Sequence, residues 1–304
     1  MRIGIIGAGA LGLYYGAMLQ RGGQDVHYLM RRDLEAVRRS GLRVTSPRGD
    51  FHLSQPAIYG DAARMGAVDL VVVGLKTYAN NILPHLIAPL LGPQTAILTL
   101  QNGLGNEELL AESFGAERVL GGVAFLCSNR GEPGTVHHLG EGRIRLGEFA
   151  GGFSDRARTI SNCFREAGVP CETVDDLRRA RWEKLVWNIP FNGLCALTGY
   201  DVTELLSHRA TREQIEGLMR EVVEGANAQG LRESIDGPSL IERMLEMSDA
   251  MDHYRPSMMV DRLEGRSLEI KAIYDIPVEY ARRAGVEMER VGMLSALLAL
   301  GEQP

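Results

Sequence analysis

Residues 2–12, "RIGIIGAGALG", decide the fold of the N-terminal half of this chain. The run begins with apolar, β-branched residues that are typical of a buried strand. Glycines follow at positions 7, 9 and 12, in the spacing Gly-x-Gly-x-x-Gly, and an apolar stretch with helical spacing comes next. A strand, a glycine-rich turn and a helix in this order predict a Rossmann-type site for a dinucleotide.

Each glycine has its own reason in that pattern. Gly7 permits the tight turn, Gly9 lets the backbone approach a pyrophosphate, and Gly12 lets the helix pack against the strand. The N-terminus of the helix adds N–H donors and the positive end of its dipole. The alternative is a glycine-rich turn that holds no ligand. We expect the whole loop to contact the cofactor: Gly7, Ala8, Gly9, Ala10, Leu11 and Gly12.

The end of the second predicted strand, "DVHYLM" at residues 25–30, distinguishes NAD from NADP. NAD sites place Asp or Glu here to bind the ribose hydroxyls. This chain instead continues with Arg31 and Arg32, and a guanidinium suits a 2′-phosphate. Asp33 keeps NAD open as an alternative, and both arginines could simply be solvated. We predict NADP, bound as NADPH, with Arg31 at the 2′-phosphate and Arg32 as its alternative.

The remainder of the first half alternates strand and helix patterns, which predicts a parallel sheet with helices on both faces. Two strands around the turn "PRGD" (47–50) predict a hairpin, and the strands after residue 119 are expected to extend the sheet at one side. Helices are expected at 11–23, 34–41, 106–114 and 154–167, and strands at 42–46, 51–55, 69–75, 96–100, 119–128, 134–140, 143–149 and 171–174.

From Asp176 onward the pattern changes to amphipathic helices without a convincing strand. We therefore predict an α/β fold, with an N-terminal Rossmann-type dinucleotide-binding domain and a C-terminal all-α domain. Residues 1–175 would form the NADP-binding domain, and residues 176–304 the helical substrate and catalytic domain. The C-terminal helices could cover their own core or form the contact of a homodimer.

Composition and charge exclude several classes of function. A net charge of −6 gives no basic surface for nucleic acid, and no apolar run reaches the roughly 20 residues of a membrane span. The cysteines and histidines have no metal-ligand spacing, so no metal site is expected. Thiols that stay free fit a reducing, cytoplasmic location. The cysteines are Cys127, Cys163, Cys171 and Cys195.

Polar residues follow two further strands of the predicted sheet. Lys76 ends the run "DLVVVGLK", and Asn102 lies in the turn "QNGLG" after the next strand. Ligands of open α/β sheets bind at the carboxyl ends of the strands, so both residues are candidates for the cofactor site. Lys76 could instead extend its amine to the surface.

A third group of polar residues lies in "RWEKLVWNIPFNGL", residues 181–194, where Lys184, Asn188 and Asn192 recur every four residues. This spacing puts them on one face of a helix. Desolvation of the Lys184 amine would lower its pKa toward the range of a general acid, and the two amides can donate to a carbonyl or carboxylate. Lys184 could equally be a surface lysine beside neighbouring arginines. Pro190 interrupts the helical hydrogen bonds and predicts a bend.

Together these pieces resemble the ketopantoate reductase family, whose members reduce 2-dehydropantoate to pantoate with NADPH. The resemblance spans nearly the whole chain, and the pieces occur in the family's order. They are "GAGALG", Arg31, "LKTY" with Lys76, "QNGLGN" with Asn102, the row Lys184–Asn188–Asn192, and "RPSMMVDRLEGRSLEI" with Ser257 and Glu269.

The resemblance implies a role for each of these residues, in an active site between a Rossmann domain and a helical domain. Lys184 would be the general acid that protonates the substrate oxygen as hydride reaches the adjacent ketone carbon. Glu269, the second catalytic residue, would bind the substrate hydroxyl. The implied pathway is pantothenate and coenzyme A biosynthesis. The implied substrate-binding residues are Asn102, Asn188, Asn192 and Ser257, and the further cofactor contacts are Lys76, Asn102 and Glu269.

Departures from the family pattern bear on the substrate. Trp187 precedes the first asparagine of the row, Pro190 lies between the two, and Gly193 follows the second. These residues put bulk and a kink beside the substrate groups, so reduction of another 2-oxo acid stays an alternative. A β-hydroxyacid dehydrogenase is the nearest other enzyme, and the segment with Ser257 and Glu269 argues against it. A non-catalytic NADP-binding sensor is the alternative outside enzymes.

Overall fold

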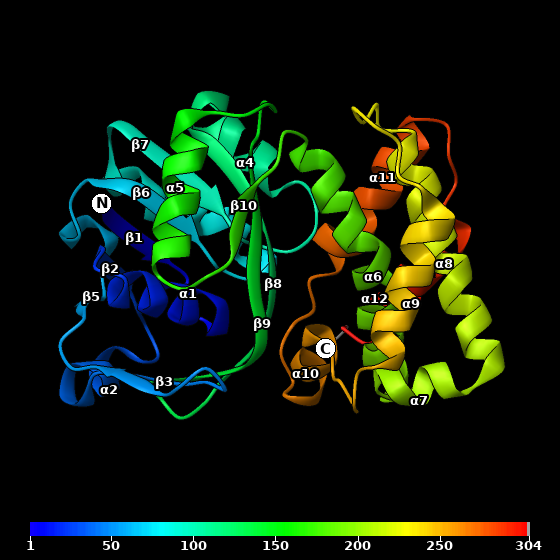
Figure 1. The fold of residues 1–304 in the computed structure, drawn as a ribbon, viewed down its shortest axis with the longest axis horizontal. Helices are drawn as coiled ribbons and strands as arrows, with labels where there is room; N and C mark the ends of the chain where they lie inside the picture. The colour runs from blue at the N-terminus through cyan, green and yellow to red at the C-terminus, as the bar shows by residue number, and fades with distance from the viewer. Residues whose placement is uncertain (303–304) are drawn as a thin grey trace. The chain divides into compact units, whose positions relative to one another are not determined.

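The computed structural model describes residues 1–302 and divides into two compact units (Figure 1). The first comprises Met1–Gln101 and Asn106–Leu177, and the second comprises Asn102–Gly105 and the chain from Arg178 onward. Four residues from the first half of the chain thus pack with the second unit, which no sequence pattern predicts. Among the described residues, no helix combines the length and the apolarity that crossing a membrane requires.

The first unit is built on a mixed sheet (Figure 1). Its strands are β1 (Arg2–Ile6), β2 (Asp25–Leu29), β3 (Leu42–Thr45), β4 (Phe51–Leu53), β5 (Ala57–Tyr59), β6 (Val68–Val73), β7 (Leu91–Thr99), β8 (Val119–Arg130), β9 (Thr135–Glu148) and β10 (Cys171–Thr173). They are ordered β4-β3-β9-β8-β7-β6-β1-β2-β5, with β10 beside β9. The pairs β3–β4 and β8–β9 are antiparallel, and the others are parallel. The predicted Rossmann-type sheet, its hairpin and its extension after residue 119 are confirmed.

One strand, β9, replaces the two that the sequence predicts at 134–140 and 143–149. Glu141 and Gly142 within it adopt φ angles of 59° and 120°. The pairing with β8 shifts register beside them. The backbone therefore bulges here while the ladder continues on both sides, so the two predicted strands are one bent strand.

Helices cover both faces of the sheet, as the alternating pattern predicts. Ile5 of β1 belongs to one core cluster with Leu13 and Phe164, whereas its neighbour Ile6 belongs to another with Leu110. Successive strand residues thus face opposite sides, and both sides are buried. The helices are α1 (Ala10–Arg21), α2 (Leu34–Ser40), α3 (Leu83–Ile87), α4 (Asn106–Phe114) and α5 (Asp155–Glu166). Leu13 lies on α1, Phe164 on α5 and Leu110 on α4.

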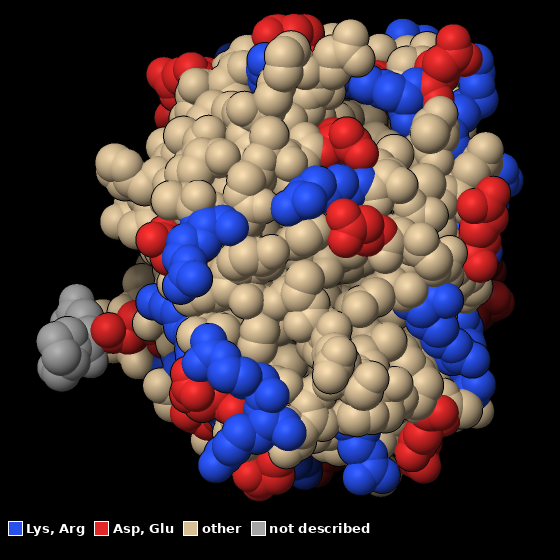
Figure 2. Space-filling view, turned by 90° about the vertical axis from the view of Figure 1, so that its left-hand side faces the viewer, with Lys and Arg blue, Asp and Glu red and all other residues tan. Residues whose placement is uncertain are grey.

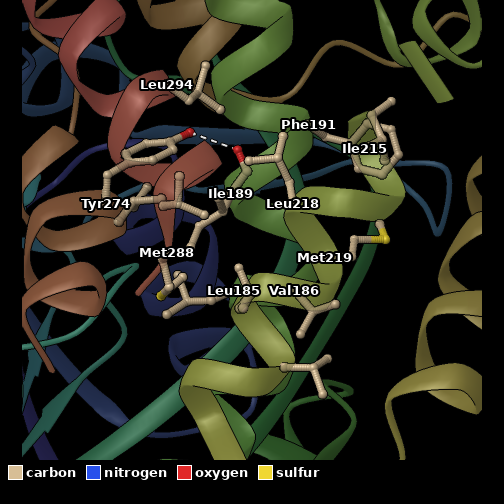
Figure 3. Close-up of a cluster of buried hydrophobic side chains, with 14 of the residues drawn as sticks. Leu185, Val186, Ile189, Phe191, Ile215, Leu218, Met219, Tyr274, Met288 and Leu294 are labelled. Atoms are coloured by element: carbon tan, nitrogen blue, oxygen red, sulfur yellow. Dashed lines mark hydrogen bonds between the residues drawn. The ribbon is translucent and has the colours of Figure 1, made fainter. Parts of the chain in front are cut away.

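The second unit is helical, and no strand occurs between Arg178 and Glu302. Its elements are α6 (Leu177–Thr198), α7 (Val202–Ser207), α8 (Arg209–Asn227), α9 (Gly237–Asp249), α10 (Ser257–Leu263), the π-helix η5 (Lys271–Asp275), α11 (Ile276–Arg283) and α12 (Glu289–Leu300). The core lies between α6, α8 and the C-terminal helices (Figure 3). Its labelled side chains are Leu185, Val186, Ile189, Phe191, Ile215, Leu218, Met219, Tyr274, Met288 and Leu294.

The predicted helix over residues 181–194 is part of α6, which continues through Pro190 to Thr198. Pro190 lacks an N–H, so the carbonyl of Val186 has no helical donor at this point. The bend expected there stays a prediction.

Charged side chains of both signs are interspersed on the face drawn in Figure 2. Some charged residues form ion pairs within a single helix, such as Arg38 with Glu35 on α2 and Arg158 with Asp155 on α5. Exposed pairs of this kind contribute only about 0–1 kcal/mol each to stability, so the fold depends on its three buried apolar clusters.

Candidate active site

The glycine-rich loop after β1 has the geometry that a dinucleotide requires. Gly7 has a φ of 102°, and a Cβ there would lie 2.4 Å from the backbone nitrogen of Leu75. A Cβ on Gly12 would lie 2.1 Å from the carbonyl oxygen of Gly7. Both positions therefore admit only glycine. Gly9 is different: among the described atoms, a Cβ there would meet only the Gly74 carbonyl, at 4.0 Å.

Open space at Gly9 coincides with the N-terminus of α1, for which Gly9 is the N-cap residue. The first N–H groups of a helix have no intrahelical partner, and α1 carries no acidic residue in its first turn. Donors and a positive dipole end thus face a position where a ligand's phosphates can approach the backbone. The loop fits a dinucleotide pyrophosphate.

The two arginines after β2 differ in exposure and in pairing from the acidic residue that follows them. The Arg31 and Arg32 side chains are exposed, and neither guanidinium forms an ion pair or hydrogen bond within residues 1–302. Asp33 is only 3% exposed and accepts a hydrogen bond from Arg130 at the end of β8. The one nearby carboxylate that would favour NAD is therefore already paired. Sequence patterns gave no sign of Arg130, because it lies 97 residues further along the chain.

The carboxyl ends of β1, β6 and β7 meet beside the glycine loop. The Gly74 N–H donates to the carbonyl of Ile6 at 2.8 Å, and the Leu100 N–H donates to that of Val73 at 2.9 Å. Lys76 follows β6 and is the N-cap residue of a short 3₁₀ helix, Thr77–Ile82. The structure thus places Lys76 at the edge of the sheet where the sequence predicts a cofactor contact.

A buried amide network that the sequence analysis missed fixes the loop after β7. Gln101 is 3% exposed, and its Nε2 donates to the Leu75 carbonyl at 2.9 Å and to Asn80 Oδ1 at 2.7 Å. Asn80 in turn donates to Asn106 Oδ1 at 2.9 Å. Gln101 and Asn106 are the residues on either side of the segment Asn102–Gly105, so both ends of that segment are held.

Within the second unit, Asn102 meets Lys184. The Lys184 Nζ donates to Asn102 Oδ1 at 2.7 Å, although 82 residues separate them in sequence. The segment is held there because the Leu104 N–H donates to the Ala272 carbonyl of η5 at 2.9 Å. The two residues that the sequence treats as separate candidates therefore form one polar pair.

Asn192, two turns beyond Lys184 on α6, contacts the start of α10. Its Oδ1 accepts from the Met258 N–H at 3.0 Å and from Ser257 Oγ at 3.4 Å. The N-cap residue of α10 is Pro256, whose side chain cannot accept a hydrogen bond, so Asn192 caps this helix from another element. Because a backbone N–H needs an oxygen, the Oδ1 atom must face α10 and the Nδ2 donors face away from it.

Asn188 lies between these two on the same face of α6. Its side chain is 5% exposed and forms no hydrogen bond within residues 1–302. An amide on this face with no protein partner among the described residues can bind an oxygen of a ligand, which makes Asn188 a candidate ligand contact.

Trp187 does not add bulk beside these groups. Its indole Nε1 donates to Ser248 Oγ of α9 at 2.9 Å, and its ring packs against Phe191 and Tyr254. The expectation that Trp187 alters the substrate site directly is not supported by this geometry, because the ring is used in helix packing.

Glu269 is 3% exposed and immediately precedes the helical turn that begins at Ile270. Nothing in the residue pattern marked this carboxylate or Ser257 as functional, and only the family resemblance pointed to them. For metal chemistry, residues 1–302 contain no cluster of three or more His, Cys, Asp or Glu side chains that could hold an ion.

Comparison with known proteins gives consistent matches. The family model "Ketopantoate reductase PanE/ApbA" matches residues 3–151, and the model of its C-terminal part matches residues 176–302. The 2-dehydropantoate 2-reductase of Nostoc sp. (strain PCC 7120) is 45% identical over 295 residues, which cover 95% of this chain and 92% of the relative.

Solved structures match along the same length. The crystal structure of 2-dehydropantoate 2-reductase from Geobacter metallireducens GS-15 has a TM-score of 0.97 and 58% identity, with 99% of each chain covered. A D-mandelate dehydrogenase solved with NADH and anilino(oxo)acetate has a TM-score of 0.91 at 22% identity, covering 99% of this chain and 98% of that one. The latter likeness shows a shared fold.

Proposed function

Because the chain belongs to the ketopantoate reductase family, we propose that it reduces 2-dehydropantoate to pantoate with NADPH. The observation that best supports the proposal is the hydrogen bond between Lys184 and Asn102, which orients an ammonium group. NADPH, when bound, supplies the hydride that reaches the ketone carbon. One 2-dehydropantoate, one NADPH and one proton give pantoate and NADP⁺.

Lys184 is the proton donor in this proposal. The ketone oxygen gains negative charge as the carbon gains hydride, and a nearby ammonium stabilises that charge and then neutralises it. Asn102 Oδ1 takes one of the three N–H bonds of the ammonium. Asn102 therefore holds the Lys184 ammonium in one direction.

Polar groups of α6 and α10 bind the rest of the substrate. The Nδ2 donors of Asn192 face away from Met258, and the Asn188 amide has no protein partner, so both can bind carbonyl or carboxylate oxygens. Ser257 adds a hydroxyl at the exposed N-terminus of α10. Glu269 would accept a hydrogen bond from the substrate hydroxyl, as the family resemblance implies.

A nicotinamide dinucleotide is the cofactor of this enzyme family, and we propose NADPH rather than NADH. Two observations support the choice. The Arg31 guanidinium is exposed and without a partner within residues 1–302, and the Asp33 carboxylate is paired with Arg130. A 2′-phosphate would therefore meet an available positive charge and no free negative one.

The deciding experiment follows NADPH oxidation by the purified protein with a panel of 2-oxo acids that includes 2-dehydropantoate. We expect 2-dehydropantoate to give the highest kcat/KM. Higher kcat/KM with another 2-oxo acid would move the substrate assignment to that compound. Binding of NADPH without turnover of any member would overturn the reductase and favour a sensor. The cytoplasmic location and the homodimer stay predictions from the sequence.

A further inference from the structure

Tyr274 is a buried residue that touches the substrate-facing elements of the second unit without belonging to the row of polar candidates. It lies in the π-helix η5, is fully buried, and its hydroxyl donates to the carbonyl of Ile189 on α6 at 3.0 Å (Figure 3). The same hydroxyl lies 3.9 Å from the sulfur of Met258 on α10. One phenol thus contacts two helices that carry candidate substrate residues.

The hydroxyl reaches α6 because Gly193 leaves room for it. A Cβ on Gly193 would lie 2.7 Å from the Tyr274 hydroxyl and 2.7 Å from Leu294 Cδ2. Gly193, one of the departures from the family pattern, therefore matches a tyrosine on another element.

The contacted atoms lie next to the candidate substrate residues. Ile189 directly follows Asn188, and the Met258 N–H is the group that holds Asn192 Oδ1. A shift of α6 against α10 would therefore change the positions of the Asn188 and Asn192 amides together.

The same π-helix also holds the segment that carries Asn102, because its Ala272 carbonyl accepts from the Leu104 N–H at 2.9 Å. A π-helix shifts the intrahelical pattern from i+4 to i+5, and such turns are frequent at functional sites. Burial raises the pKa of Tyr274 well above its usual value, so the phenol remains a donor at all pH values of enzymatic interest.

We propose that Tyr274 is a positioning residue for the substrate, which sets the spacing between the two asparagines of α6 and Ser257 of α10. It touches neither the proton donor nor the glycine loop in the described contacts, so it acts on substrate affinity rather than on cofactor binding. The proposal rests on the reductase function proposed above and adds a residue that determines how well that substrate is held.

Tyr274→Phe removes only the hydroxyl and tests this role. We expect the KM for 2-dehydropantoate to rise about tenfold, because misplaced donors bind the substrate less well, while kcat and the KM for NADPH change by less than about twofold. Steady-state kinetics with each reactant varied in turn measure all three values.

Tyr15→Phe is the matched control. Tyr15 is equally buried, and its hydroxyl also donates to a backbone carbonyl, that of Gly142 at 3.2 Å, but it lies in the first unit. Both variants should lose thermal stability, and only Tyr274→Phe should raise the KM for the 2-oxo acid. Equal KM values in wild type, Tyr15→Phe and Tyr274→Phe would overturn the proposal and leave Tyr274 a packing residue.

A second variant reaches the same contact from the other side. In Gly193→Ala the new methyl collides with the Tyr274 hydroxyl, so the KM for the 2-oxo acid should rise here too. Adding Tyr274→Phe removes the hydroxyl and should bring this KM part of the way back to the wild-type value. If the effects of the two substitutions on log KM simply add in the double variant, the result would contradict the proposal. Turnover of 2-dehydropantoate by the wild type tests the proposed function separately. The role of Tyr274 is tested by the ratio of variant to wild-type KM, which is measured with whichever 2-oxo acid the wild type reduces.

Discussion

Lysine is rare in this chain: it occurs at three positions, 76, 184 and 271, among 33 Lys and Arg residues. Everywhere else a cation is needed, the chain uses arginine. An arginine cannot release a proton at accessible pH, whereas a lysine can, so a position that must donate a proton cannot follow the general preference. The presence of lysine rather than arginine at 184 therefore fits the proposed proton donor, independently of its spacing from the asparagines.

We predict that Lys184→Ala and Lys184→Arg both lose kcat with 2-dehydropantoate, by on the order of 10²–10⁴-fold, because neither residue can protonate the oxygen. NADPH binding, measured by fluorescence titration, should be retained in both. Lys271→Arg is the control, because Lys271 is exposed. Substantial turnover by Lys184→Arg would show that the residue acts only as a charge.

We expect cofactor choice to depend on the ion pair between Asp33 and Arg130, as well as on the arginine proposed to bind the 2′-phosphate. Arg130→Gln would leave the buried Asp33 carboxylate unpaired beside the proposed 2′-phosphate site. We expect the KM for NADPH to rise about tenfold and that for NADH to change little, since only NADPH brings a second negative group. The double variant Arg130→Gln/Asp33→Asn should restore the KM for NADPH. Arg31→Ala should raise the KM for NADPH and leave that for NADH nearly unchanged. Equal effects on both cofactors would contradict this account.

At the scale of elements, the strongest local signals predicted the fold well. The run of residues 2–12 combines a strand, three glycines with distinct steric reasons and a helix, and the structure reproduces each of them. The sequence divides residues 134–149 into two strands, whereas the structure has one, because pairing with β8 continues on both sides of the bulge at Glu141 and Gly142.

Contacts between distant elements could not be read from sequence. The pairs Arg130–Asp33 and Tyr274–Ile189 join residues 97 and 85 positions apart. Neither has a local spacing that would mark it, because helical and strand periodicities report only neighbours within one element. Lys184, Asn188 and Asn192 were visible for the opposite reason, since all three lie on one face of α6.

The segment before α10 is tied to α7 by a pH-sensitive contact. His253 Nδ1 lies 2.7 Å from Asp201 Oδ2, and Asp201 is also the N-cap residue of α7 in a capping box with Glu204. The hydrogen bond to Asp201 raises the pKa of His253. A raised folded-state pKa means that this stabilisation is complete below the unfolded pKa of about 6.5 and is lost as pH rises through the folded value.

We therefore expect the Tm to fall as the pH rises above about 6.5, through loss of this contact, and we expect His253→Gln to flatten that part of the profile. His208→Gln is the control, because His208 is also exposed and its side chain takes no part in the contact with Asp201. Calorimetry across the pH range measures both. Parallel pH profiles for wild type and His253→Gln would rule out a contribution from the pair.

At the scale of the whole molecule, the chain passes between its two compact units more often than a two-domain sequence requires. It leaves the first unit after Gln101, packs four residues with the second, and returns at Asn106. The boundary predicted near residue 175 does not include this excursion. The excursion carries Asn102, so the partner of the proposed proton donor is supplied by a segment from the other half of the chain.

Gly103 makes that excursion possible. Its φ is 81°, and a Cβ there would lie 2.3 Å from the Ala272 carbonyl oxygen, the atom that holds the Leu104 N–H. We expect Gly103→Ala to displace the segment from η5 and move Asn102 away from Lys184. The kcat with 2-dehydropantoate should fall by about 10- to 100-fold, because the ammonium is no longer aimed, while NADPH affinity is kept by the glycine loop of the first unit.

Gly285→Ala separates this effect from backbone strain alone. Gly285 has nearly the same φ, 80°, and a Cβ there meets nothing within 4 Å among the described residues. Both variants should lose about 1 kcal/mol of stability from a left-handed alanine, measured by denaturant unfolding, but only Gly103→Ala should lose turnover. If the two variants keep equal kcat, the docking of Asn102–Gly105 on η5 does not set the geometry of the proton donor, and Lys184 must be oriented by other groups.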